Sequence, residues 1–289
     1  SIQVNAAPQP HKAADNAAPT APAPLNSAAR TQKLYGRNAL IRTLVQNSLT
    51  NNTLAIYGMR GNGKSELIGA LLKQPPFHDM GQPLRINAHG EYRAADLFRQ
   101  LAPMLGDTSE YPTPPTGSRE TITQTLKERY PSVRPVCIWI DKAHLLFNAK
   151  GWVNAELGQL FLACNQAFSD RLHWFFELRE RPLHPALLGA TCHMEEVPGL
   201  DRNSLAQCLR EAAPAGQETE WTYTGDELKR LYQWLGGGQG EQAHPLAIRL
   251  LIEVALGKQL NPHQALTQLH RETEQRLEDA LLVDLYQSV

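Results

Sequence analysis

The residue types with the clearest chemistry lie in one short segment, Gly58-Met59-Arg60-Gly61-Asn62-Gly63-Lys64-Ser65. Its Gly-x-x-x-x-Gly-Lys-Ser spacing is the Walker A pattern of a phosphate-binding loop. The glycines let backbone N–H groups approach phosphate oxygens, Lys64 is expected to reach the β- and γ-phosphates, and the Ser65 hydroxyl is expected to ligate Mg²⁺. We therefore expect the whole segment, including Arg60 and Asn62, to bind ATP or ADP with Mg²⁺.

The second component of such a site is an acidic residue, which is expected at the end of a buried strand, where it would help to hold Mg²⁺. Asp141 follows directly after the continuous apolar run 136–140 and is our prediction for this role, together with Ser65. ATPases of this type usually place a glutamate directly after that aspartate to polarise the attacking water. Here the next residue is Lys142, and a protonated lysine cannot act as a base. Hydrolysis is therefore expected to be slow or absent, unless another group substitutes.

Two side chains are alternatives for the missing base, and a third is a candidate sensor. His144 lies three residues after Asp141, and Glu177 lies at the end of the predicted strand 172–176. Arg179, just beyond that strand, is placed to distinguish ATP from ADP at the γ-phosphate. Arg181 is an alternative cation that would serve a neighbouring subunit instead.

These residues need a scaffold that brings strand ends together. Short apolar segments alternate with amphipathic helical segments from residue 34 to about residue 200, and this alternation predicts an α/β fold with a mostly parallel sheet between two layers of helices. The predicted strands are 53–57, 83–87, 136–140, 172–176 and 192–197. The predicted helices are 38–48, 64–73, 94–105, 119–130 and 154–168.

The strand signal disappears after Leu200. Four helical segments are predicted beyond it: 202–213, 225–235, 245–256 and 261–287. We therefore expect a P-loop ATPase core at 34–200, followed by a smaller, all-helical lid domain at 201–289. Residues 1–33 are rich in Ala and Pro and poor in large apolar side chains, so we expect a disordered linker there.

Composition narrows the possible partners. The 289 residues contain 28 Lys plus Arg and 29 Asp plus Glu, so the net charge of −1 gives no basic surplus that would indicate nucleic acid. No apolar run approaches the roughly 20 residues that cross a bilayer. With no secretory signal recognisable either, a cytoplasmic location is expected.

Four motifs, in this order, resemble those of STAND and origin-recognition-like AAA+ ATPases. Tyr35-Gly36-Arg37 resembles the hydrophobic-Gly-Arg box that precedes Walker A, and Arg179 with Arg181-Pro182 is similar to the sensor of NACHT and NB-ARC proteins. Residues 194–200 resemble the segment that follows the sensor. His244-Pro245-Leu246-Ala247 resembles the Gly-x-Pro-Leu-Ala motif of the helical lid, with His244 where glycine is usual.

The resemblance implies nucleotide contacts from Tyr35, Arg37 and Pro245. It also implies a switch that holds ADP in one state and ATP in another, acts on protein partners and forms a nucleotide-dependent homo-oligomer. Two alternatives stay open at this point. One is a DNA-associated AAA+ ATPase of the replication-initiator or transposition-regulator type, and the other is a nucleotide-binding adaptor that does not hydrolyse ATP, with Lys142 as its signature.

Overall fold

A computed structural model describes residues 36–182, 184–237 and 242–272. The predicted linker at 1–33, Tyr35 and the part of the last predicted helix beyond Glu272 lie outside the described residues. The strands and helices predicted between these limits are present, most of them with ends that shift by no more than two residues.

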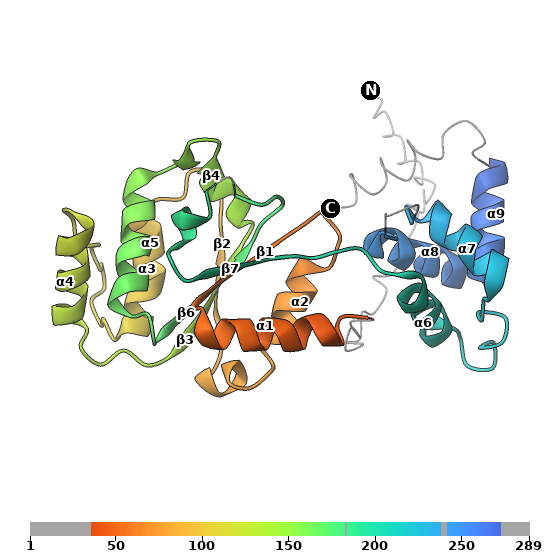
Figure 1. The fold of residues 1–289 in the computed structure, drawn as a ribbon, viewed down its shortest axis with the longest axis horizontal. Helices are drawn as coiled ribbons and strands as arrows, with labels where there is room; N and C mark the ends of the chain where they lie inside the picture. The colour runs from red at the N-terminus through yellow and green to blue at the C-terminus, as the bar shows by residue number, and fades with distance from the viewer. Residues whose placement is uncertain (1–35, 183, 238–241, 273–289) are drawn as a thin grey trace, which may run out of the picture. The chain divides into compact units, whose positions relative to one another are not determined.

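Five parallel strands form the central sheet (Figure 1). They are β1 (Thr53–Tyr57), β2 (Leu84–Asn87), β3 (Val136–Asp141), β6 (Leu172–Glu177) and β7 (Cys192–Glu196). Their spatial order is β2-β3-β6-β1-β7, so β6 lies between the strand that leads into the Walker A segment and the strand that ends at Asp141. Because all neighbours are parallel, all carboxyl ends meet at one edge of the sheet.

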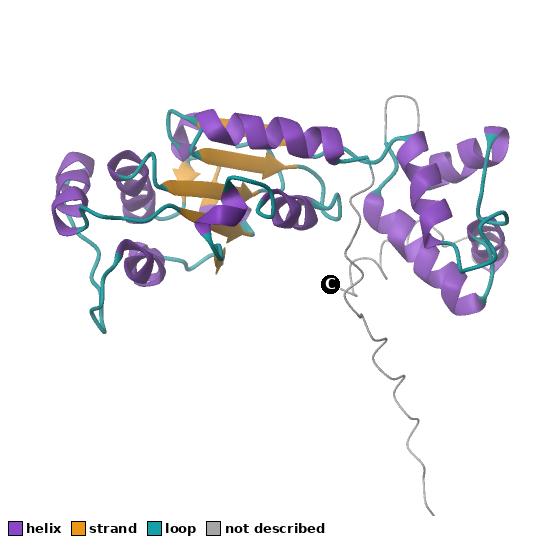
Figure 2. Ribbon diagram, turned by 90° about the horizontal axis from the view of Figure 1, so that it is seen from below, coloured by secondary structure: helices purple, strands orange, loops and turns teal. Residues whose placement is uncertain are grey.

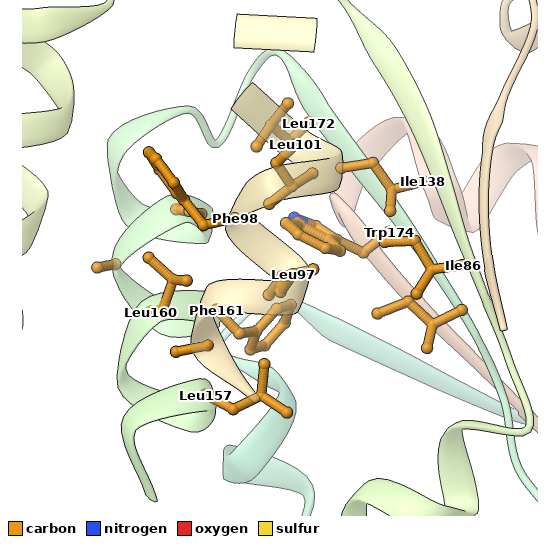
Figure 3. Close-up of a cluster of buried hydrophobic side chains, with 14 of the residues drawn as sticks. Ile86, Leu97, Phe98, Leu101, Ile138, Leu157, Leu160, Phe161, Leu172 and Trp174 are labelled. Carbon is orange, nitrogen blue, oxygen red and sulfur yellow. The ribbon is translucent and has the colours of Figure 1, made fainter. Parts of the chain in front are cut away.

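Helices cover both faces of this sheet, which confirms the predicted three-layer α/β fold (Figure 1). Side chains alternate between the faces along each strand. In β3, Ile138 and Ile140 pack against α3 (Ala94–Leu105) and α5 (Ala155–Ala167), and α4 (Arg119–Arg129) packs against α5. Figure 3 shows this cluster, with Trp174 of β6 among helix side chains.

The opposite face of the sheet carries the second apolar cluster. Cys137 and Trp139 of β3 and Phe175 of β6 pack here with side chains of α1 (Asn38–Thr50) and α2 (Lys64–Leu71). Asp141 lies two residues beyond Trp139, and Glu177 lies two residues beyond Phe175. Because side chains two residues apart in a strand point to the same face, both acids project toward the face that α2 covers.

The described residues after Leu200 form helices and connecting loops, as predicted (Figure 2). It contains α6 (Arg202–Ala212), α7 (Gly225–Trp234), α8 (Pro245–Lys258) and α9 (Pro262–Glu272). These helices share an apolar cluster of their own, in which Trp221 is 1% exposed. Asn261 accepts a hydrogen bond from the backbone N–H of Gln264 at 2.9 Å and so caps α9.

Several short elements were not predicted. They are the 3₁₀ turns η1 (Phe77–Met80), η2 (Ala143–Leu146) and η3 (Pro185–Leu188), and a ribbon of β4 (Phe147–Asn148) with β5 (Gly151–Trp152). A single 3₁₀ turn or a strand of two residues carries no readable hydrophobic period. Within the described ranges, no helix is both long and apolar enough to cross a bilayer.

Candidate nucleotide site

The Walker A segment connects β1 to α2, and its glycines are required by the backbone. Gly58, Gly61 and Gly63 have φ angles of 141°, 82° and 78°, values that side chains rarely tolerate. A Cβ atom at Gly58 would lie 2.8 Å from the carbonyl oxygen of Val197, and one at Gly61 would lie 2.6 Å from the ring of His244. The loop is therefore closely packed on both sides.

The start of α2 suits an anion. Its N-cap, Gly63, has no side chain that could accept hydrogen bonds from the first turn. The first N–H groups of a helix have no acceptor within the helix, and they carry the positive end of the helix dipole. This arrangement fits a phosphate group, whose oxygens would accept those hydrogen bonds.

Lys64 is folded against the same loop. Its side chain is buried, and Nζ donates hydrogen bonds of 2.8 Å to the carbonyl oxygens of Gly58 and Met59. Burial lowers the pKa of Lys64, and the charge of Glu177 opposes this shift. The ammonium group is thus fixed beside the loop with an acidic side chain in electrostatic range.

Glu177 is the acid that contacts the Walker A serine. The Ser65 hydroxyl lies 2.9 Å from both carboxylate oxygens of Glu177, so it can donate to either. Burial raises the pKa of Glu177, and the hydrogen bond from Ser65 is the largest effect in the other direction. The central position of β6 accounts for this contact, because Glu177 is paired with Ile56 of β1 in the sheet.

Asp141 has a partner that was not predicted. Arg85 of β2 donates a hydrogen bond to its carboxylate at 2.7 Å, and the Arg85 guanidinium lies 4.1 Å from the centre of the Trp139 ring. Arg85 is paired with Trp139 in the sheet, and Asp141 is two residues further along on the same face. In the sequence, Arg85 appears only as an arginine inside a short apolar strand. This pattern does not show which residue of the next strand Arg85 contacts.

Lys142 and the candidates around it have different surroundings. Lys142 is exposed and adopts a left-handed conformation, with φ of 55°. His144 is half-buried; burial lowers its pKa most, Arg179 and Lys64 lower it further, and Asp141 opposes them. The structure thus brings His144, Arg179 and the two acids to one edge of the sheet, close to Lys64.

Arg37 and Asn62, both predicted nucleotide contacts, bond to the chain that leaves β7. The buried Arg37 guanidinium donates to the carbonyl oxygen of Pro198, and Asn62 Nδ2 donates to that of Val197 at 2.9 Å. Burial lowers the pKa of Arg37, and Asp201 opposes the shift. In the structure these two side chains bond to the segment that follows β7. Their contact with nucleotide stays a prediction.

Pro245 is the first residue of α8, and the residue before it contacts the Walker A segment. His244 Nε2 donates a hydrogen bond to the carbonyl oxygen of Arg60 at 2.7 Å. Gly61 lies against both His244 and Leu246. Sequence reasoning identified His244 only as a departure from the glycine of the motif, and its bond to the loop was missed.

The oxygen-rich set around Ser65 also fits a divalent cation. Mg²⁺ prefers one or two carboxylates together with hydroxyl and phosphate oxygens, and Ser65, Glu177 and Asp141 supply such groups. These residues would hold the ion, which would neutralise phosphate charge.

Comparisons with known proteins agree with this fold. Residues 34–182 match the family described as Novel STAND NTPase 6. No curated protein matches the sequence. Among solved structures, the fold is similar to that of a Walker-type ATPase of Pyrococcus abyssi, with a TM-score of 0.51 and 15% identity over 88% of this chain and 76% of that one.

Two further structures have lower scores. A STAND protein with a tetratricopeptide repeat sensor from Pyrococcus horikoshii has a TM-score of 0.48 and 17% identity, over 80% of this chain and 32% of that one. The Orc1 protein of Aeropyrum pernix, in complex with DNA, has a TM-score of 0.48 and 15% identity, over 83% and 67%. The present chain spans about a third of the length of that STAND protein.

The family match carries more weight than these structural likenesses, because it covers 149 of the 289 residues (182 − 34 + 1) and includes β1, the phosphate loop, β3 and β6. The chain belongs to the Novel STAND NTPase 6 family.

Proposed function

We propose that this chain is a nucleotide-dependent switch that binds ATP or ADP with Mg²⁺, acts on protein partners and forms a homo-oligomer in one nucleotide state. In this proposal residues 34–200 are the ATPase core and residues 201–289 are the helical lid.

The observation that carries the proposal is the contact between the phosphate loop and the start of α8. His244 bonds to the Arg60 carbonyl, and Leu246 packs near Gly61. Nucleotide phosphates and the lid would therefore act on the same loop. A ligand shifts a conformational equilibrium only by its different affinity for the two states, and a γ-phosphate beside this loop supplies such a difference.

The charges around the loop support a site that distinguishes ATP from ADP. Lys64 is within electrostatic range of the cation Arg179 and of the acid Glu177. The negative charge of an added γ-phosphate would attract Lys64 and Arg179 and repel Glu177. STAND-type switching on this basis does not require rapid hydrolysis.

Hydrogen exchange of residues 243–258 tests the proposal directly. The amide protection of α8 is measured without nucleotide, with ADP and with a slowly hydrolysed ATP analogue, each with Mg²⁺, and the oligomeric state is followed by light scattering. We expect different protection with ADP and with the analogue, and no response to either in Lys64→Ala. Equal protection with the two nucleotides would contradict the switch, and failure of the wild-type chain to bind either nucleotide would contradict the proposal as a whole.

A further inference from the structure

One acid of the nucleotide site is held by an arginine from the neighbouring strand. Arg85 of β2 donates a 2.7 Å hydrogen bond to Oδ2 of Asp141, the last residue of β3. The same guanidinium lies 4.1 Å from the centre of the Trp139 ring. Trp139 is buried and is the sheet partner of Arg85, two residues before Asp141 on the same face. Arg85 therefore makes two contacts at once, one with the acid and one with the aromatic ring.

The order of the strands separates this arginine from the other residues that would hold Mg²⁺. β3 lies between β2, which carries Arg85, and β6, which ends at Glu177. Glu177 lies 2.9 Å from the Ser65 hydroxyl and is within electrostatic range of Asp141. Arg85 thus approaches Asp141 from the β2 side, and its hydrogen bond uses one of the two carboxylate oxygens. The other oxygen, Oδ1, is the one left for a cation.

The charge of Arg85 has two opposite effects on a cation at Asp141. It repels the cation, but it also offsets the repulsion between the carboxylates of Asp141 and Glu177, and its charge-assisted hydrogen bond fixes the orientation of Asp141. The Arg85 side chain is 54% exposed and that of Asp141 is 15% exposed. Water therefore screens the repulsion of the cation, whereas screening does not remove the geometric restraint. Orientation should outweigh repulsion.

We propose that Arg85 is a positioning residue, which holds the Asp141 carboxylate in the orientation that binds the divalent cation of the nucleotide site. This inference rests on the proposed function. Carboxylates that bind metal ions are themselves hydrogen-bonded, and loss of such a partner typically lowers metal affinity by about 10- to 100-fold. The Trp139 ring supports the flat guanidinium beside the acid. The ammonium group of a lysine cannot make both contacts with the same geometry.

The test compares wild type with Arg85→Met, which keeps an unbranched side chain and removes its charge and its hydrogen bonds. Arg99→Met is the matched control, because Arg99 lies on α3, is exposed and pairs with Asp96 at 3.6 Å. Titration calorimetry measures the affinity for a slowly hydrolysed ATP analogue, first without divalent cation and then with saturating Mg²⁺. The ratio of the two affinities isolates the part of binding that depends on the cation.

We expect this ratio to fall by about 10-fold or more in Arg85→Met, while the affinity without Mg²⁺ stays close to the wild-type value. Arg99→Met should match wild type in both measurements. Arg85→Lys keeps the positive charge and guards against a folding defect in the methionine variant. Its ratio should lie below that of wild type and above that of Arg85→Met.

Four results would overturn the inference while leaving nucleotide binding by wild type intact. An unchanged ratio in Arg85→Met would show that the ion pair does not position a cation ligand, and a higher ratio would show that the charge of Arg85 opposes the cation. An equal fall in affinity with and without Mg²⁺ would assign Arg85 a structural role. A wild-type affinity that does not respond to Mg²⁺ would leave no cation to be positioned. Absence of analogue binding by wild type would instead contradict the proposed function.

Discussion

The two ends of the sheet both carry polar clusters, but the clusters are of different kinds. At the amino ends of the strands, Asn52, Thr53, Asn165 and Thr191 bond to one another. None of these side chains is charged, and three of the four are buried. At the carboxyl ends the groups are charged, and burial shifts the pKa values of Lys64 and Glu177 toward their neutral forms.

This difference separates a structural role from a functional one. Buried polar groups that bond to one another stabilise the fold. Buried charges with shifted pKa values cost stability and cluster at functional sites. The amino end is therefore expected to matter for folding, and the carboxyl end for ligand binding. Each prediction below tests one side of this division.

Lys64→Ala should have the largest effect. Loss of the ammonium group removes charge-assisted hydrogen bonds to phosphate, each worth about 1.5–3 kcal/mol, so ATP affinity should fall by at least about 100-fold. The melting temperature should change little, because the loss of two hydrogen bonds to the loop is offset by the removal of a buried charge. Titration calorimetry and thermal unfolding measure the two effects. A Lys64→Ala variant with a much lower melting temperature and unchanged ATP affinity would contradict the division between the two ends of the sheet.

Asn165→Ala should do the reverse. Its side chain bonds to Asn52 and Thr53, so both lose a buried partner. We expect the free energy of unfolding to fall by about 1–3 kcal/mol, the cost of leaving buried polar groups unsatisfied. Chemical denaturation measures this loss. ATP affinity should be unchanged, and a large fall in affinity with intact stability would contradict a purely structural role.

His244 should make the contact between the loop and α8 sensitive to pH. Burial lowers its pKa below the ordinary value of 6.5 and Lys64 lowers it further, while the bond to Arg60 opposes them. The packed state therefore favours neutral imidazole, and its stabilisation is complete above pH 6.5 and is lost as the pH falls through the lowered pKa. Protection of α8 from hydrogen exchange should drop on acidification.

His244→Gln is the control for this effect, because its amide can donate to the Arg60 carbonyl without titrating. His244→Ala should lose the bond at every pH, at a cost of about 0.5–1.5 kcal/mol. A pH dependence that persists in both variants would assign the effect to another group.

Lys142→Gly should have the smallest effect. Glycine adopts the left-handed conformation of this turn without the steric cost that other residues incur. We expect a gain in the free energy of unfolding equal to the left-handed cost of about 1–2 kcal/mol less the about 0.4–1 kcal/mol that the greater freedom of glycine in the unfolded chain removes, whereas Lys142→Ala should show none. Thermal unfolding checks both. A loss of stability in the glycine variant would show that the Lys142 side chain contributes contacts that offset the cost.

The sequence predicted the features that are encoded locally. The continuous apolar run before Asp141 and the alternation of strands with helices indicated the fold class, and the glycine spacing of residues 58–63 indicated the loop between β1 and α2. The contacts of Arg85 with Asp141, of Asn62 with Val197 and of His244 with Arg60 join residues that lie 56, 135 and 184 positions apart. No local pattern encodes such pairs, since they depend on strand order and on how the segment after Leu200 meets the loop.

The contacts around Arg60 and Asn62 have a mechanical consequence. Asn62 holds the carbonyl of Val197, and the chain continues from there to Leu200, which exchanges two backbone hydrogen bonds with Ala243. The next residue is His244, which bonds back to Arg60. These hydrogen bonds and the chain between them form a closed ring of contacts. A displacement of the loop must either move all of these segments together or break one of the hydrogen bonds, so the loop is expected to change position in discrete steps and not by gradual drift.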